Sequence, residues 1–329
     1  MNAPGLYSAI YPPHTLFSRY WYNTLHQVTK QLTPDADTTR FWYDRLGRLV
    51  VSRNAKQKDN NTYSYTIYDQ LGRIIEVGQK GTPHPMLDDT SRNDIALNKW
   101  IKYGANSTCT ELTHTYYDVA ALPVNVHFGT AGQTYLRSRV ASVCIEDTYD
   151  ADSLTYANGT HYSYDIAGNV KTVIQKIGDL RSKVQAFKKI DYSYDLVSDI
   201  VNKVNVQKDS VDQFIYKYDY DDDDKILNVW TTLDGRYWEQ DAAYAYNQVG
   251  QLRRTELGNW QVQGIDYAYT VQGWLKGINA TDVYYKHDMG NDGWSTKPNA
   301  RFGRDVYGMT LGYFNNDYSN VSNTQIEGS

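Results

Sequence analysis

Acidic residues are the first candidates for chemistry in this chain, because carboxylates at short spacing can bind a divalent cation. The run "YDYDDDDK", residues 218–225, is dense in acids. An EF-hand loop that began at Asp219 would need Gly at its sixth position and Glu at its twelfth, but these positions hold Asp224 and Trp230. A second cluster, "HDMGNDGW", places Asp288 and Asp292 beside glycines. These two residues are only weak metal candidates, because the cluster lacks a third and fourth ligand and resembles an ordinary Gly/Asn/Asp loop.

The chain carries no pattern that is typical of a catalytic or cofactor site. Its seven histidines are scattered, and neither a nucleophile elbow nor a phosphate-binding glycine loop is present. Cys109 and Cys144 are too few for a disulfide framework or a metal site. One bridge between them would suit an oxidising compartment, while two buried thiols are the simpler interpretation. We therefore expect no enzyme activity and no cofactor.

Composition excludes two further classes of protein. The net charge of −5 argues against a nucleic-acid-binding protein, which normally has a basic balance. No apolar run is long enough to span a bilayer, and the first residues lack the cationic start and apolar core of a signal peptide. The unusual feature is 31 tyrosines against 8 tryptophans and 7 phenylalanines. Because tyrosine favours strands and has an apolar body with a polar tip, this excess indicates half-buried sheet faces.

One short phrase recurs, first as "FWYDRLGRLV" and then as "TIYDQLGRII". In the first copy Asp44 opens a four-residue turn and Gly47 closes it, which is the favoured pattern of a type I turn. A left-handed glycine there gives a three-residue hairpin loop with a bulge. Aromatic residues precede the turn and aliphatic residues follow it, and both are strand formers. The phrase predicts a β-hairpin.

Nine copies of this phrase follow one another along the chain, each anchored by a tyrosine. The anchors are Tyr22, Tyr43, Tyr68, Tyr117, Tyr164, Tyr194, Tyr220, Tyr246 and Tyr269. They are spaced by 21 to 30 residues, apart from gaps of 49 and 47 that flank Tyr117. Each of these two gaps hides an eroded copy or an insertion. Repetition at a fixed period is typical of a repeat architecture rather than of two ordinary domains.

The copies agree at three places around the anchor. The turn motif is formed by Asp44, Gly47, Asp69, Gly72, Asp165, Gly168, Gly250 and Gly273. The closing position holds His26, Ala121, Ser198 or Asp224 in the other copies, and of these Ala121 and Ser198 imply a different turn. Another aromatic usually lies two residues before the anchor, so the two rings share one sheet face. Two residues after the closing position the residue is apolar in every copy but one, where it is Pro123.

Tyr-Asp-x-x-Gly-Arg-Leu at this spacing resembles the YD-repeat, or Rhs-repeat, family of large secreted bacterial proteins. The resemblance covers about residues 20–280, and "RDVYGMTLGYFNNDY" resembles the end of an Rhs repeat region. It implies an all-β fold in which repeated hairpins form a curved, spiralling sheet, here an open arc of a shell. We expect a lead-in over 1–19, the repeat sheet over 20–279 and an irregular end-piece over 280–329. An insertion at about 80–112 should carry a helical turn near 95–101.

The resemblance also implies a function. Relatives form a hollow shell around a toxic C-terminal segment, and teneurin-type relatives use a similar shell at cell surfaces. We expect a non-catalytic shell segment, secreted or at the surface of a bacterium, whose partners are the rest of a longer Rhs-type polypeptide or a toxin cargo. Open sheet edges would allow self-association. The alternative is an adhesion or carbohydrate-binding scaffold, in which the tyrosines would be exposed instead of packed in the sheet.

Self-cleaving relatives of this family carry an Asp-Pro-x-Gly motif. The nearest stretch here begins at Asp305, where Val306 replaces the proline, and no second copy is present. The cleavage activity of the family is therefore not transferred to these residues.

Overall fold

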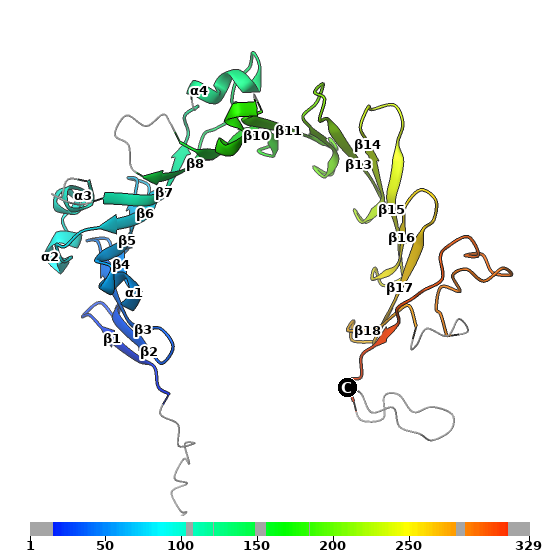
Figure 1. The fold of residues 1–329 in the computed structure, drawn as a ribbon, viewed down its shortest axis with the longest axis horizontal. Coiled ribbons are helices and arrows are strands. Elements are labelled where there is room, and N and C mark those ends of the chain that lie inside the picture. Colours follow the sequence, from blue (N-terminus) through cyan, green and yellow to red (C-terminus); the bar gives the residue numbers. More distant parts are fainter. Residues whose placement is uncertain are drawn as a thin grey trace, which may run out of the picture. The chain divides into compact units, whose positions relative to one another are not determined.

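The computed structural model describes residues 16–102, 108–120, 122–148, 156–183, 185–280 and 287–314. These residues form an almost entirely antiparallel β-structure, with few and short helices (Figure 1). The strands are β1 (Arg19–Tyr22), β2 (Val28–Thr33), β3 (Asp37–Tyr43), β4 (Leu49–Arg53), β5 (Thr62–Tyr68), β6 (Ile74–Gly81), β7 (Thr108–Tyr117), β8 (Val140–Thr148), β9 (Asn158–Tyr164), β10 (Val170–Lys176), β11 (Phe187–Tyr194), β12 (Val201–Val206), β13 (Phe214–Tyr220), β14 (Ile226–Thr232), β15 (Glu239–Tyr246), β16 (Leu252–Leu257), β17 (Gln263–Tyr269), β18 (Leu275–Ile278) and β19 (Met309–Thr310). The helices are α1 (Ala55–Asp59), α2 (Asp88–Ser91), α3 (Asp94–Lys102), α4 (Leu122–Asn125) and the 3₁₀ turns η1 (Val126–Phe128) and η2 (Gly178–Lys183). The expected all-β fold of repeated hairpins is confirmed.

The chain forms two compact units, which share β10. The first unit comprises residues 1–168 and 174–187, and the second comprises 169–173 and 188–329. From β1 to β9, and again from β11 to β19, each strand pairs antiparallel with the next along the chain. The curvature and open ends of an arc depend on how the two units are placed, so they stay predictions.

The repeated phrase forms the hairpin turn that the sequence predicts. The Gly47 amide donates to the Asp44 carbonyl at 3.1 Å, and the Asp44 amide donates to the Arg48 carbonyl at 2.9 Å. The Asp44 carboxylate accepts the amides of Leu46 and Arg48, so the side chain holds the turn from inside. The five closing glycines all have positive φ, between 81° and 105°: Gly47, Gly72, Gly168, Gly250 and Gly273.

A β-bulge precedes the anchor tyrosine in most hairpins. In the β3–β4 pair, Tyr43 lies opposite Leu49 and Trp42 opposite Val51, so Val50 has no opposite residue. The same shift in register occurs at Tyr22, Tyr68, Tyr117, Tyr194, Tyr220, Tyr246 and Tyr269. A bulge increases the local twist of the strand, so each hairpin has the same twist beside its turn.

Both long gaps between anchors contain insertions rather than eroded copies. The first follows β6, where residues 82–102 carry α2 and α3 before β7 begins at Thr108. The insertion is therefore shorter than the expected 80–112, because β6 ends at Gly81 and β7 begins at Thr108. The helix expected near 95–101 is α3. The second lies inside the turn after Tyr117: the Asp118 amide bonds the Arg139 carbonyl at 3.2 Å, which closes the turn after an inserted loop.

Two assignments of the closing position need correction. Ala121 lies outside the described residues, and the left-handed residue that precedes Arg139 is Ser138, with φ 61°. In the copy anchored by Tyr194 the turn is one residue longer, and Asp199 rather than Ser198 has positive φ, at 57°. Sequence spacing alone could not locate these positions, because both turns differ in length. With Ser138 as the closing residue, the apolar position is Val140 rather than Pro123.

The two units differ in the residues that their sheet faces carry. In the first unit, Met86, Leu97 and Ile101 of the insertion pack with strand residues, so one sheet face forms an apolar core. The strand residues of this core are Trp42, Val50, Val51, Tyr63, Tyr65, Cys109 and Leu112. In β13 of the second unit, Tyr216 and Tyr218 alternate instead with Lys217 and Asp219, which form an ion pair at 3.2 Å.

Two further expectations concern the cysteines and the membrane. Cys109 and Cys144 are two buried free thiols, which is the simpler of the two interpretations of the sequence. Among the residues that the structure describes, no helix is both long and apolar enough to cross a bilayer.

Candidate functional site

Six of the anchor tyrosines each tie their hairpin to the one before it. The Tyr43 hydroxyl donates to the Val28 carbonyl at 2.8 Å, and Val28 begins the second strand of the preceding hairpin. The same contact joins Tyr68 to Leu49, Tyr164 to Val140, Tyr194 to Val170, Tyr220 to Val201 and Tyr246 to Ile226, at 2.6–2.9 Å. We call this series the tyrosine ladder. It explains why a tyrosine, and not a phenylalanine, recurs at the anchor.

The Asp and Arg of the motif complete the contact. The Arg48 guanidinium bonds the Asp44 carboxylate at 2.7 Å and lies 4.5 Å from the centre of the next anchor ring, Tyr68. Arg73 pairs with Asp69 in the same way and lies 4.3 Å from the Tyr117 ring. Asp therefore positions Arg, and Arg stacks on the following repeat. A cation held over an aromatic ring contributes about 0.5–1 kcal/mol at an exposed site.

Aromatic residues two positions apart stack as the sequence predicts. The rings of Tyr216 and Tyr218 are 6.5 Å apart and almost parallel, and Tyr162 and Tyr164 are also stacked at 6.5 Å. Burial, with smaller effects from neighbouring tyrosines, raises the pKa of Tyr218. Most anchor rings are half-buried; Tyr164 is buried and Tyr22 is exposed. The engaged hydroxyls favour packing over sugar binding for the anchors.

The ladder has one more member that sequence reasoning missed. The Tyr313 hydroxyl donates to the Leu275 carbonyl at 2.8 Å, and the Tyr313 ring lies 5.1 Å from that of Trp274. Leu275 and Trp274 occupy the positions that Leu49 and Arg48 have in the first phrase. The available signal was the sequence "LGYFNND", which follows the last copy after a long insertion. The described part of the end-piece is thus irregular as far as β19, and Tyr313 just after it makes the ladder contact again.

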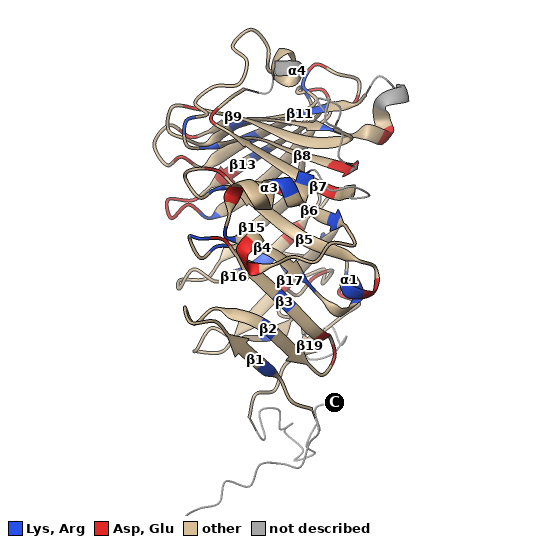
Figure 2. Cartoon of the chain, turned by 90° about the vertical axis from the view of Figure 1, so that its left-hand side faces the viewer, with Lys and Arg blue, Asp and Glu red and all other residues tan. Residues whose placement is uncertain are grey.

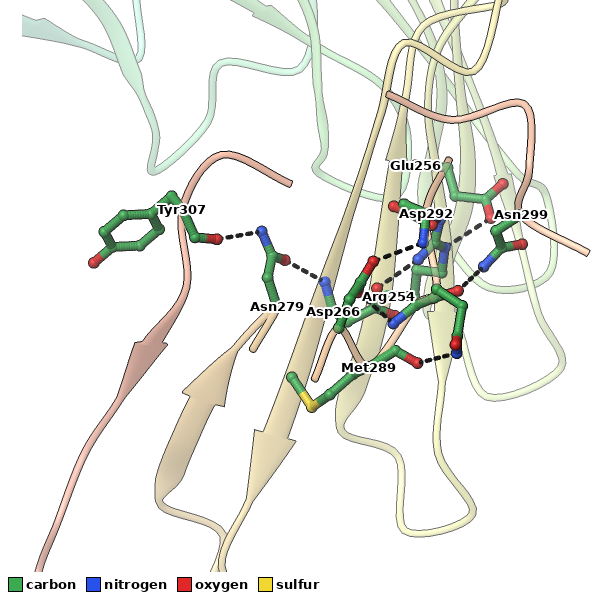
Figure 3. A network of polar contacts seen from close by, with 11 residues as sticks. Arg254, Glu256, Asp266, Asn279, Met289, Asp292, Asn299 and Tyr307 are labelled. Carbon is green, nitrogen blue, oxygen red and sulfur yellow. Dashed lines mark hydrogen bonds and ion pairs between the residues drawn. The ribbon is translucent and has the colours of Figure 1, made fainter. Parts of the chain in front are cut away.

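A buried polar network lies where the end-piece contacts the sheet (Figure 3). At its centre the Arg254 guanidinium bonds the carboxylates of Asp266, from β17, and Asp292, from the end-piece. The Arg254–Asp292 distance is 2.8 Å, and Glu256 accepts from the same guanidinium at 3.0 Å. The Asp288 carboxylate accepts the amides of Gly290 and Asp292 and so shapes the loop.

Backbone and ring contacts hold the rest of the end-piece against the sheet. Asn279 accepts from the Asp266 amide at 2.9 Å and donates to the Tyr307 carbonyl at 3.0 Å. The Gly303 amide donates to the Val262 carbonyl, and the buried Phe302 ring lies 4.7 Å from the Arg254 guanidinium. We call residues 287–308 the end segment; they join β18 to β19 and cover part of β16 and β17.

The network holds more carboxylates than its single guanidinium can neutralise. Burial, followed by the neighbouring Asp288 and Asp292, raises the pKa of Asp305 to about 7. Burial also raises the pKa of Asp266 to about 6 and that of Asp292 above its ordinary value. Both oxygens of Asp305 and one of Asp292 are buried without a hydrogen-bond partner. Asp305 is therefore partly protonated at neutral pH, whereas ordinary surface aspartates are ionised there.

Neither acidic stretch of the sequence forms a metal site in the described part of the chain. Asp288 and Asp292 belong to the network around Arg254, and no three His, Cys, Asp or Glu side chains among the described residues are placed to hold a metal ion. The run at 218–225 is a hairpin turn, in which Asp221 accepts the amides of Asp223 and Lys225. Asp224 closes that turn with φ 63°.

A serine–histidine contact that the sequence does not reveal lies in the first unit. His161 contacts the Ser142 hydroxyl at 2.7 Å and the Tyr156 hydroxyl at 2.8 Å. His161 and Ser142 are fully buried, so a substrate cannot reach them. Burial, with the nearby Lys176 and His127, lowers the pKa of His161 to about 4. The contact is a structural one, in which the buried polar groups of Ser142, Tyr156 and His161 satisfy one another.

Comparison with known proteins gives a likeness of fold. The chain matches no protein-family model and no curated protein. It is similar to the crystal structure of TcdB2-TccC3, with a TM-score of 0.53, 16% identity and coverage of 79% of this chain and 11% of that chain. The structure without the hypervariable C-terminal region gives a TM-score of 0.52 at 16% identity, with the same coverage. A mutant Tc holotoxin pore of Photorhabdus luminescens gives 0.52 at 17%, again covering 79% and 11%. The chain thus has the β-sheet fold of a part of these toxin-complex chains and spans about a tenth of their length.

Proposed function

We propose that the chain is a structural segment of an Rhs-type shell, which encloses or scaffolds a toxin cargo or a partner. The observation that carries the proposal is the tyrosine ladder, which joins hairpin to hairpin through ring and backbone contacts. Contacts of this kind would join successive hairpins into a wall without requiring any exposed reactive group. The likeness in fold to chains of toxin complexes supports the same role.

The proposed partners follow from the size of the segment. Because the chain spans about 11% of the toxin-complex chains that it resembles, a closed wall needs the remainder of a longer polypeptide. The cargo would be a C-terminal toxin, and the site of action a bacterial surface or the medium. Exposed strand edges also allow self-association. Acidic and basic residues are interspersed over the sheet in Figure 2, which supports the proposal that nucleic acid is not a partner.

Limited proteolysis of the polypeptide expressed from its natural reading frame tests the shell proposal. Residues 16–314 should persist as a resistant block, and any passenger attached to them should be digested only after the wall is denatured. Mass spectrometry identifies both products. A passenger that is cut while the block stays intact would contradict enclosure, and a block that falls apart at the hairpin turns would contradict the ladder.

We also propose that the chain has no catalytic role, and the acidic network is the place to test this. A carboxyl with a pKa near 7 can donate and accept a proton at neutral pH, and Asp305 has this property. Self-cleaving relatives have a proline after the corresponding aspartate, where this chain has Val306. We expect the intact mass to stay constant during long incubation at pH 5 and at pH 7. A fragment released near Asp305 in the wild type, and not in Asp305→Asn, would establish self-cleavage instead.

Carbohydrate binding is the second candidate, and one observation favours it. Tyr192, Tyr216, Tyr218 and Tyr244 lie close together in the second unit and are only half-buried. Their rings could stack on sugars, while the anchors are engaged in the ladder. Binding to a glycan array, lost in Tyr216→Ala and kept in Tyr43→Ala, would establish this function. The shell proposal predicts no binding by either protein.

A further inference from the structure

The end segment is held to the sheet by an excess of acid over base. Arg254 is the guanidinium of the network, and the acids around it are Glu256, Asp266, Asp288, Asp292 and Asp305. Arg301 and Arg304 of the same segment are exposed. On the sheet side, β18 contributes Gly277, which has no side chain, next to Ala268. Burial of like charges without a counter-charge is costly, so at least one of these carboxyls must bind a proton when the segment is docked.

Asp305 is the carboxyl for which the geometry is least favourable to a charge. Neither of its oxygens has a hydrogen-bond partner, and both are buried. Asp288 offers Asp305 only another carboxyl, which can bond it when one of the two carries a proton but repels it when both are ionised. Arg254 is occupied by Asp266, Asp292 and Glu256. The loop backbone approaches the network closely, because a methyl group added at Gly290 would lie 2.2 Å from an Asp266 oxygen and 3.0 Å from an Asp292 oxygen.

We propose that the end segment is a proton-controlled latch: it docks on β16 and β17 while Asp305 is protonated and is released when Asp305 loses its proton. Release would uncover Arg254, Asp266 and the edge formed by Val262 and Gln263, where Gly303 now makes its bridge. The latch concerns the attachment of residues 287–308, so it does not depend on the proposed shell function. It requires no metal ion or cofactor.

The direction of the pH dependence follows from the raised pKa values. A carboxyl whose pKa is higher in the docked segment than in the released segment stabilises docking. This stabilisation is complete below the pKa of the released state and is lost as the pH rises through the pKa of the docked state. That value is about 7 for Asp305 and about 6 for Asp266, and the pKa of Asp292 is also raised. The segment should therefore be held in mild acid and loosened above neutral pH. With a pKa of about 7 when docked and an ordinary value of 3.8 when free, Asp305 alone should lower the docking constant on the order of a hundredfold between pH 5 and pH 8.

Hydrogen exchange of the whole chain tests the latch. Exchange is measured at pH 5 and pH 8, corrected for the intrinsic pH dependence of amide exchange, and read by mass spectrometry. Protection of residues 287–308 should fall on the order of a hundredfold at the higher pH. The insertion at 82–102, whose contacts with the sheet are largely apolar, should keep its protection and serves as the reference in the same molecule.

Variants assign the effect to Asp305. Asp305→Asn is neutral at every pH, so its end segment should stay docked at both values and lose most of the pH dependence, with a smaller contribution left from Asp266. His287 is the histidine of the end segment and serves as the control for another ionisable side chain: His287→Gln should retain the wild-type response. If Asp305→Asn fails to dock, Asp288→Asn, which removes one like charge, should still reduce the response. An unchanged response in Asp305→Asn, loss of the response in His287→Gln, or equal protection of the wild type at both pH values would overturn the proposal.

Discussion

Two inserted segments interrupt the repeat at equivalent places, and they are attached to the sheet by opposite chemistry. Residues 82–102 follow β6, the second strand of one hairpin, and the end segment follows β18, the second strand of another. The first is helical and buries Met86, Leu97 and Ile101. The second is irregular and buries Asp288, Asp292 and Phe302. Each covers a part of the sheet within its own unit.

The difference shows what each kind of attachment can do. Apolar burial is non-directional and does not depend on protonation, so the first insertion should be held equally well at any pH near neutrality. A buried ion network instead gains little net stability but is strongly weakened when one member is removed or changes its charge. The end segment therefore has the properties of a switchable attachment, and the first insertion those of a permanent one.

Removal of the central guanidinium should have the largest effect. In Arg254→Met the side chain keeps its length, but Asp266 and Asp292 lose their cation while they remain buried. The free energy of unfolding of the second unit should fall by about 3–5 kcal/mol at neutral pH, measured by urea denaturation. Below about pH 6 the loss should be smaller, because Asp266, whose pKa is about 6 even beside Arg254, then becomes neutral.

The control is an ion pair at the other insertion. Arg45 and Asp94 are 3.0 Å apart, and their side chains are 68% and 53% exposed. Arg45→Met should change stability by no more than about 1 kcal/mol, because exposed pairs are screened by solvent. Equal losses in Arg254→Met and Arg45→Met would show that burial of the network is not what makes it important.

Ile101→Ala should have the next largest effect, now at the apolar attachment. Ile101 is fully buried in the core under α3, so its truncation leaves a cavity that should cost about 2–5 kcal/mol. Unlike the loss in Arg254→Met, this loss should be the same at pH 5 and pH 8. Ile95 lies on the same helix but is 82% exposed, so Ile95→Ala should change the unfolding free energy by less than about 0.5 kcal/mol.

The sequence predicts the hairpins much better than it predicts these attachments. Each hairpin is local: the aspartate, the glycine and the tyrosine of one phrase lie within five residues, so their roles can be recognised in a string of letters. The contacts of Arg254 with Asp266 and Asp292 join residues up to 38 positions apart, and no short pattern encodes them. Asp288 and Asp292 were noticed only as weak metal candidates. Asp292 instead pairs with Arg254, which lies on a strand of the repeat, and Asp288 accepts two backbone amides of its own loop.

The ladder too was only half visible in the sequence. The recurrence of tyrosine is evident in the sequence, but its hydroxyl bonds a backbone carbonyl about 20 residues earlier. Every residue has such a carbonyl, so no residue type marks the acceptor. Tyr313 was missed because the end segment separates it from Tyr269 by more than one period. The insertion inside the turn after Tyr117 hid Ser138 in the same way, since the motif was read as contiguous.

Gly47→Ala tests the hairpin turn of the repeated phrase. Gly47 has φ 81°, which a residue with a Cβ adopts only with strain, so the substitution should destabilise the first unit by about 1 kcal/mol or more. Gly258 is no control, although it lies outside the motif, because its φ is 78°. Gly277 is a better one: its φ is not left-handed, and an added methyl group would meet its nearest neighbour at an ordinary 3.4 Å. Similar losses in Gly47→Ala and Gly277→Ala would count against the proposed turn register.

The smallest effect should come from a single hydroxyl of the ladder. Tyr164→Phe keeps the ring, which is buried, and removes the bond to the Val140 carbonyl at 2.8 Å. The free energy of unfolding should fall by about 1 kcal/mol, the usual net value of one hydrogen bond, with more lost if the carbonyl stays unpaired. Tyr22 provides the matched control, because it anchors the first copy, is 59% exposed and contacts no preceding hairpin among the described residues. Tyr22→Phe should be nearly neutral. If the two substitutions cost the same, the recurring tyrosine serves the packing of its ring alone, and the hydroxyl contacts do not join the hairpins into a wall.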